Sequence, residues 1–188
     1  MPELPDIIIY IEQLEARLKD HILEEVCVSS PFLVRTWDPP LACSHGKRIL
    51  RMRRIGKRIV FCLEDDLFLV LHLMIAGRLH WKPQDERIPG KIRLAAFRFP
   101  NGTLILTEAG SKKRASLSLI RGAAALEECD PGGLEVPGAD CEAFAAALLR
   151  ENHTLKRSLT DPHLFCGIGN AYSDEILHRA HLSVIPRL

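Results

Sequence analysis

Residues 58–75 read RIVFCLEDDLFLVLHLMI, and this stretch decides the fold class. Two short apolar runs flank the turn-forming pair Asp65-Asp66, which is the pattern of two strands joined by a tight connection. Asn101-Gly102, between two further runs, is a strong hairpin signal. The chain from about residue 22 to 120 is therefore predicted to form an antiparallel sandwich or barrel, with strands in the runs 22–28, 58–64, 67–75, 93–99 and 103–109.

A helix is predicted ahead of these strands. After Pro5, apolar residues recur at helical spacing while charged residues fill the other face. Proline at the first helical position loses no hydrogen bond, and Asp6 suits the positive end of the helix dipole. We therefore expect the helix to begin at Pro5 and to hold the N-terminus in place. Its apolar positions are Ile7, Ile8, Ile11, Leu14 and Leu18.

The C-terminal part changes from strand-like to helical patterns. Residues 130–140, DPGGLEVPGAD, are dense in Gly and Pro and predict a linker. Asp140 and Thr154 are suitable caps for the first two of the helices that follow. The predicted class is α+β, with a β-sandwich domain at 1–125, a linker at 126–140 and a helical domain at 141–188. Its helices are expected at 141–150, 155–161 and 171–182.

Composition is typical of a globular protein, with 47% hydrophobic and 26% charged residues, and excludes a disordered tail. No apolar run approaches the roughly 20 residues of a membrane span, and acidic residues stand where a signal peptide is basic. We expect an intracellular monomer, cytoplasmic or nucleoid-associated, without membrane contact. The six cysteines occur singly, without a Cys-x-x-Cys pair, and therefore favour buried thiols over a metal site.

Positive charge is concentrated locally although the net charge is only +1. In KRILRMRRIGKR, residues 47–58, seven of twelve positions are Lys or Arg and none is acidic. Such charges would repel one another unless phosphates lie nearby, so the run favours a nucleic-acid partner over a merely solvated strand. A second basic cluster, SKKR, occupies 111–114.

Two further segments suit chemistry with anions or carbonyl groups. GIGNAYSDE, 167–175, places two glycines just before a helix, where free amides bind anions, although an ordinary capping loop has the same pattern. At the N-terminus, removal of Met1 would expose the secondary amine of Pro2. An α-amine has a pKa of about 8, against about 10.4 for lysine, so part of it is a free nucleophile near neutrality.

Taken in order, these motifs resemble the formamidopyrimidine-DNA glycosylase and endonuclease VIII family. The resemblance rests on MPELPD at the start, RRIGKR with Lys57 expected on a strand, HLMIAGRL at 72–79 and LKRSLTDPHLFCGIGNAYSDEIL at 155–177. It implies an N-terminal helix and β-sandwich joined to a helix-two-turn-helix domain. It also implies a DNA repair enzyme that excises oxidised or ring-opened bases from damaged duplex DNA and cleaves the abasic site by β-elimination.

The resemblance assigns roles to individual residues. Pro2 is the Schiff-base nucleophile, Glu3 the general acid at the deoxyribose, and Lys57 the lysine that holds a phosphate near the lesion. Asn170 binds a DNA phosphate. The further residues implied are His72, Met74, Ile75, Lys113, Arg114 and Tyr172 as DNA contacts, with Asp6, where the family usually has Glu, and Glu175 in support.

Two loops leave open which damaged base is the substrate. A wedge must fill the gap left by an extruded base; the family's methionine aligns with Ile75, Met74 lies one position away, and either can insert. Many relatives carry Asp-Pro-Arg-Arg-Phe-Gly where residues 107–117 read TEAGSKKRASL, so that Lys113 or Arg114 contacts the opposite base. Both an oxidised purine and an oxidised pyrimidine remain possible substrates.

The end of the sequence also departs from the family. Relatives continue through a further helix and usually a four-cysteine zinc finger, whereas this chain stops at SVIPRL. We expect a fragment or a natural truncation with an incomplete helix-two-turn-helix domain, and we assign no metal or cofactor to it. Two other functions are weighed: a non-catalytic module that binds damaged DNA, and a tautomerase, which fits Pro2 alone and leaves the basic run unexplained.

Overall fold

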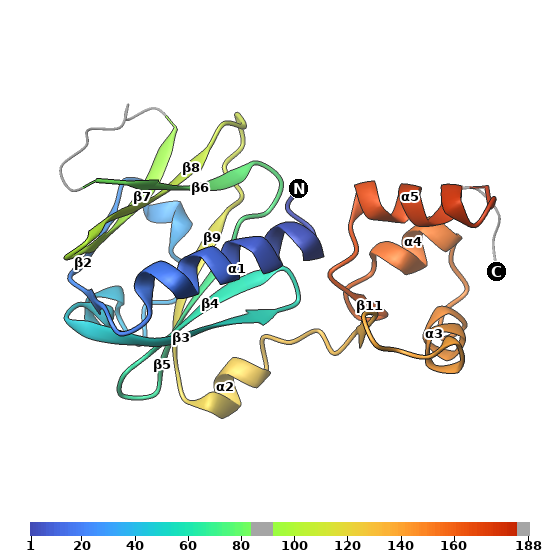
Figure 1. Ribbon diagram of the computed structural model, residues 1–188, viewed down its shortest axis with the longest axis horizontal. Helices are drawn as coiled ribbons and strands as arrows, with labels where there is room; N and C mark the ends of the chain where they lie inside the picture. The colour runs from blue at the N-terminus through green and yellow to red at the C-terminus, as the bar shows by residue number, and fades with distance from the viewer. Residues whose placement is uncertain (84–91, 184–188) are drawn as a thin grey trace.

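The computed structural model describes residues 1–83 and 92–183, in which a β-rich part is followed by a helical part (Figure 1). In chain order the elements are α1 (Leu4–Leu18), β1 (Ile22–Leu23), β2 (Glu25–Val28), η1 (Pro31–Leu33), η2 (Leu41–Ser44), β3 (Lys47–Ile55), β4 (Arg58–Leu63), β5 (Leu67–His72), β6 (Gly77–Lys82), β7 (Arg93–Phe99), β8 (Gly102–Glu108), β9 (Ser116–Arg121), α2 (Ala123–Glu127), β10 (Leu134–Glu135), α3 (Cys141–Leu148), α4 (Leu155–Thr160), β11 (Phe165–Cys166) and α5 (Asn170–Arg179).

The β-rich part is a sandwich of two sheets. One sheet has five strands in the order β1-β3-β4-β5-β9, and the other has four in the order β2-β7-β8-β6. Phe61 of β4 and Phe97 of β7 stack across the interior with ring centroids 5.8 Å apart. Of the two predicted alternatives, sandwich and barrel, the sandwich is the observed one.

Both predicted turns are present. β4 and β5 pair antiparallel up to Leu63 and Leu67, and the left-handed backbone of Asp65 (φ 61°) and Asp66 (φ 54°) reverses the chain. β7 and β8 pair up to Phe99 and Gly102, so that Pro100 and Asn101 connect them. Left-handed conformations are several-fold enriched at Asp, which explains why Asp65-Asp66 marks its turn, and Gly102 adopts a φ of 152° that other residues rarely take.

The long apolar runs of β4 and β5 reflect burial on both faces of their sheet. Alternate residues such as Phe61 and Leu69 face the interior of the sandwich. The intervening residues, Val60 and Val70 among them, pack outside it with Leu126 of α2. Antiparallel strands usually alternate apolar and polar residues, so this continuous pattern requires a cover such as α2.

Helix α1 begins one residue earlier than expected. Glu3 is its N-cap and Leu4 its first residue, so Pro5 stands at the second helical position, where a backbone N–H is still dispensable. Ile7, Leu14 and Leu18 are buried against the sandwich. The N-terminal end of α1 points toward the helical part (Figure 1).

The helical part has a small apolar core of its own. α3, α4 and α5 enclose Leu155, Leu159, Phe165 and Leu177, among others. The expected caps are present, because Asp140 accepts from the Ala143 amide at 2.7 Å and Thr154 from the Arg157 amide at 3.4 Å.

The stretch predicted as a linker, 126–140, contains structure that the sequence analysis missed. α2 reaches into it, and β10 pairs in parallel with β11. Within the described ranges, no helix is long and apolar enough to cross a membrane.

Candidate active site where the two parts meet

The N-terminus lies at the junction of the two parts (Figure 1). Glu3 joins them through hydrogen bonds to α5. Its side chain is only 2% exposed. One carboxylate oxygen accepts from the backbone amides of Gly169 at 2.7 Å and Tyr172 at 3.1 Å, and the other accepts from Ala171 at 2.9 Å. These are amides of the first turn of α5, where free N–H groups and the helix dipole favour an anion. The anion-binding geometry predicted for GIGN is thus present, with the chain's own Glu3 as the anion.

Glycines allow this close approach. A Cβ at Gly169 would lie 2.6 Å from the carboxyl carbon of Glu3, so no larger residue fits without displacing that side chain. Gly167 has a φ of 84° and accepts a hydrogen bond from the Leu4 amide at 3.0 Å. The GIGN loop therefore holds both the backbone and the side chain of the N-terminal segment.

Asp6 fixes the same segment from within α1. The Glu3 amide donates to a carboxylate oxygen of Asp6 at 2.9 Å, a contact of capping-box type. This bond anchors the backbone of the residue next to Pro2. Pro2 itself is buried, whereas Met1 is 41% exposed.

Lys57 lies in a tight turn and not on a strand as the sequence analysis had it. Ile55 of β3 pairs with Arg58 of β4, which leaves Gly56, with a φ of 54°, and Lys57 as the connecting residues. Burial lowers the pKa of the Lys57 ammonium, and the charge of Glu3 opposes this shift. The turn therefore brings a cation near the buried Glu3 carboxylate.

A cavity of about 140 Å³ opens at this point between the two parts. Four of its lining residues are predicted site residues or the neighbour of one: Met1, Lys57, His72 and Met74. Burial lowers the pKa of His72 to about 4, and the positive charges of Arg58 and Lys57 add to the shift. His72 is thus a neutral imidazole near pH 7. The other lining residues are Gly56, Arg58, Pro131, Pro162, Cys166 and Gly167.

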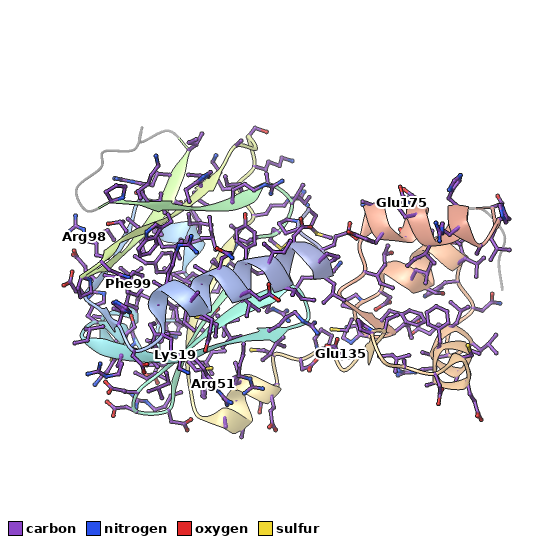
Figure 2. The ribbon with its side chains drawn as sticks, in the orientation of Figure 1. Lys19, Arg51, Arg98, Phe99, Glu135 and Glu175 are labelled. Carbon is purple, nitrogen blue, oxygen red and sulfur yellow. The ribbon has the colours of Figure 1, made fainter. Side chains whose placement is uncertain are left out.

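Arg54 makes a second link between the parts, which sequence reasoning missed. Its guanidinium donates to Glu135 of β10 at 2.5 Å, to the Gly56 carbonyl at 3.0 Å and to the Cys166 sulfur of β11 at 3.3 Å. Figure 2 places Glu135 at the boundary between the two parts. The parts are therefore held together on both sides of the cavity, by Glu3 and by Arg54.

Some cations of the basic run 47–58 have carboxylate partners that the sequence of the run does not show. Three of its seven cations have carboxylate partners: Lys47 with Asp65 at 2.5 Å, Arg48 with Glu64 at 3.4 Å and Arg54 with Glu135 at 2.5 Å. The inference that this run needs phosphates to offset its charge is wrong for these three positions. Most of the partners lie on other strands or turns, so the run alone could not reveal them.

The basic loop 109–115 is organised by a buried carboxylate. Glu108 is 1% exposed and accepts from the amides of Arg114 at 2.9 Å and Ala115 at 3.2 Å. The Lys113 ammonium turns back and donates to the Glu108 carbonyl. The loop is thus held by its backbone and by Lys113, while the Arg114 side chain is exposed.

The loop 73–77 lies beside it, because Gly77 and Glu108 are paired residues of β6 and β8. Ile75, at its tip, is 51% exposed, whereas Met74 lines the cavity. The two candidate wedge residues therefore differ in their surroundings.

The predicted site residues of α5 lie at different places along the helix. Asn170 and Tyr172 are exposed in its first turn, next to the amides that bind Glu3. Glu175 lies further along the helix with its side chain exposed (Figure 2), and it does not line the cavity. The structure does not bring Glu175 to the cavity, and its predicted orienting role stays a prediction.

Known proteins are similar to this chain in sequence and in fold. Residues 1–109 match the family model described as the formamidopyrimidine-DNA glycosylase N-terminal domain. The formamidopyrimidine-DNA glycosylase of Heliobacterium modesticaldum is 31% identical over 97% of this chain and 68% of its own length. This chain belongs to the formamidopyrimidine-DNA glycosylase family. The family member of Thermus thermophilus is also 31% identical, over 97% of this chain and 66% of its own length.

Solved structures of the family have the same fold. A complex between the Lactococcus lactis Fpg and an abasic site containing DNA superposes with a TM-score of 0.88, at 25% identity. The match covers 98% of this chain and 69% of that chain. The matched chains are thus about half as long again as the present one.

Within residues 1–83 and 92–183, no three His, Cys, Asp or Glu side chains lie close enough to hold a metal ion. The cysteines are all free thiols, three of them half-buried, two buried and one exposed. The described residues therefore do not fit a zinc finger.

Proposed function

We propose that this chain is a DNA glycosylase with abasic-site lyase activity that removes oxidised or ring-opened bases from duplex DNA. It acts as a monomer through a Schiff base to Pro2. One observation carries the proposal: the Glu3 carboxylate, adjacent to Pro2, is buried and held by three amides of α5 near Lys57. Membership of the formamidopyrimidine-DNA glycosylase family supports DNA as the substrate.

Pro2 becomes a nucleophile once Met1 has been removed. The exposed side chain of Met1 lines the cavity, so its loss both frees the Pro2 nitrogen and vacates part of the space beside it. A secondary amine suits the reaction, because the iminium ion it forms keeps its positive charge without a proton. The bonds from Glu3 and Leu4 to the GIGN loop hold this nitrogen in position, as catalysis by orientation requires.

The reaction proceeds in three steps. The Pro2 nitrogen bonds to C1′ as the bond from C1′ to the base breaks, and the departing base takes a proton from solvent. The Pro2 proton passes to the Glu3 carboxylate, which delivers it to ring oxygen O4′ as the C1′–O4′ bond breaks and the iminium forms. Loss of a C2′ proton then sends an electron pair toward the iminium, and the C3′–O bond breaks with departure of the phosphate.

Exposed and cationic residues around the cavity hold the DNA. Lys57 contacts a phosphate near the lesion, and its lowered pKa reflects its partial burial. Asn170, exposed at the start of α5, contacts a second phosphate. Of the two candidates for the opposite base we favour Arg114, because Lys113 is engaged with the Glu108 carbonyl.

A duplex oligonucleotide with one abasic site tests the proposal. The chain with Met1 removed should nick the abasic strand, and Pro2→Gly should abolish nicking while leaving duplex binding unchanged. Ala171→Gly is a matched control, since it alters a neighbouring exposed position but keeps the backbone amide that binds Glu3. Binding without any nicking by the chain with Met1 removed and no substitution would instead support the non-catalytic DNA-binding module.

A further inference from the structure

Lys57 reaches the cavity from a two-residue turn, and the backbone of that turn sets its direction. Ile55 pairs with Arg58, so Gly56 and Lys57 connect β3 to β4. Burial and the charge of Glu3 act on the Lys57 ammonium, but in the described part of the chain it donates no hydrogen bond. The space that the ammonium can reach is therefore set by how the turn is held.

Arg54 ties the turn to the helical part. Its half-buried guanidinium donates to the Gly56 carbonyl at 3.0 Å, to Glu135 of β10 at 2.5 Å and to the Cys166 sulfur of β11 at 3.3 Å. The guanidinium is planar, and its donors point in fixed directions. Three bonds from one rigid group therefore fix the Gly56 carbonyl, within the turn, relative to β10 and β11.

Arg58 holds the other end of the turn. Its guanidinium donates to the Cys129 carbonyl at 2.6 Å. Cys129 follows α2 and begins the segment that leads through Pro131, a lining residue of the cavity, to β10. One end of the turn is thus bonded to the connection between the two parts, and the end at Gly56 is bonded to the helical part through Arg54. Both bonds depend on how the two parts are docked.

We propose that Arg54 is a positioning residue for Lys57, which aims the ammonium at a DNA phosphate when the helical part is docked on the sandwich. The inference rests on the phosphate contact that the proposed function gives to Lys57. Loss of the three bonds frees the Gly56 carbonyl, and the turn can then move while the Lys57 ammonium stays charged. The loss therefore acts on the phosphate contact and not on the total charge of the protein.

The salt dependence of DNA binding tests this positioning separately from catalysis. For a duplex with a tetrahydrofuran abasic analogue, the logarithm of the binding constant falls linearly with the logarithm of the salt concentration, by about 0.9 per phosphate contact. With Met1 removed throughout, Lys57→Ala should make this slope shallower by about 1. Arg54→Lys keeps the charge, but one ammonium cannot make the three bonds, so the slope should become shallower by a similar amount. Adding Arg54→Lys to Lys57→Ala should change the slope no further.

Arg51→Lys is the matched control. Arg51 is an exposed arginine of the same strand and lies well apart from Glu135 (Figure 2), so the slope should keep its wild-type value. Single-turnover nicking of abasic duplex should fall roughly tenfold to a hundredfold in Arg54→Lys and keep its wild-type rate in the control. If Arg54→Lys does not fold, Glu135→Gln tests the same link from an exposed position. It should slow nicking, with no further effect in Lys57→Ala.

An unchanged slope in Arg54→Lys, or a further change when it is combined with Lys57→Ala, would overturn the inference. Equal effects of Glu135→Gln on nicking with and without the Lys57 side chain would do the same. In each of these cases a wild-type chain that nicks abasic DNA leaves the proposed function intact. A wild-type chain with the predicted slopes that nicks no abasic strand would overturn the proposed function and leave the inference standing. A chain that does not bind the duplex would overturn both.

Discussion

Replacing Glu3 with glutamine should undock the N-terminal segment from α5. Glu3→Gln keeps the shape of the side chain but removes its charge and one acceptor. The oxygen of the amide can occupy the position that accepts from Gly169 and Tyr172, and its NH₂ group then faces the Ala171 amide. Two hydrogen bonds lose their charge assistance, and the third is replaced by two opposed donors.

The magnitude follows from these contacts. A hydrogen bond to a charged group contributes about 1.5–3 kcal/mol and a neutral one about 0.5–1.5 kcal/mol. Because Glu3 is only 2% exposed, water does not replace the lost partners. Weakening two bonds and losing the third should cost about 4 kcal/mol. Local opening should therefore become more frequent by up to roughly a thousandfold.

Hydrogen exchange followed by NMR measures this opening directly. Exchange of the Gly169, Ala171 and Tyr172 amides should accelerate in Glu3→Gln, whereas amides in the centre of β4 should keep their wild-type protection. Glu12→Gln replaces an exposed glutamate of the same helix and is the control. It should change the opening free energy of these amides by no more than about 0.5 kcal/mol. Unchanged protection of the three amides in Glu3→Gln would refute the interdomain role of Glu3.

Three further predictions concern other residues of the site. The folded-state pKa of His72, about 4, lies below its ordinary 6.5, so its contribution to stability is complete above pH 6.5 and is lost as the pH falls toward 4. In the wild type, the free energy of unfolding measured with urea should therefore fall by up to about 3 kcal/mol between pH 6.5 and pH 4. His72→Gln should abolish this pH dependence. Glu108→Gln should lower the unfolding free energy by about 2 kcal/mol through weaker bonds to the basic loop, while Glu128→Gln, at an exposed position, should not. Gly169→Ala places a Cβ against Glu3 and should slow nicking of abasic DNA by about a hundredfold, and wild-type rates in this variant would contradict the required close approach.

The β-sandwich could be predicted because its signals are local. Each strand and each turn, such as Asn101-Gly102, lies within a short window of the sequence, and the pairing of β4 with β5 follows from their proximity. Helix α2 and strand β10 were missed for the opposite reason. They have five and two residues, too few to show a helical or strand period.

The contacts that build the site are not local. Glu3 and Gly169 are separated by 166 residues, and Arg54 and Cys166 by 112 residues. The GIGN pattern left open whether the segment is an anion site or an ordinary capping loop, and no pattern in the sequence indicated that Glu3 accepts from its amides. Its burial against the amides of α5 is visible only once both parts of the chain are folded.

The central claim is that Pro2 is the nucleophile, and covalent trapping tests it most directly. The chain with Met1 removed should be incubated with abasic-site duplex DNA and borohydride, digested, and analysed by mass spectrometry. We predict a cross-link between the sugar and the Pro2 nitrogen, lost in Pro2→Gly and in chains that retain Met1. A cross-link on Lys57 or another lysine, or equal trapping with Met1 retained, would contradict the account.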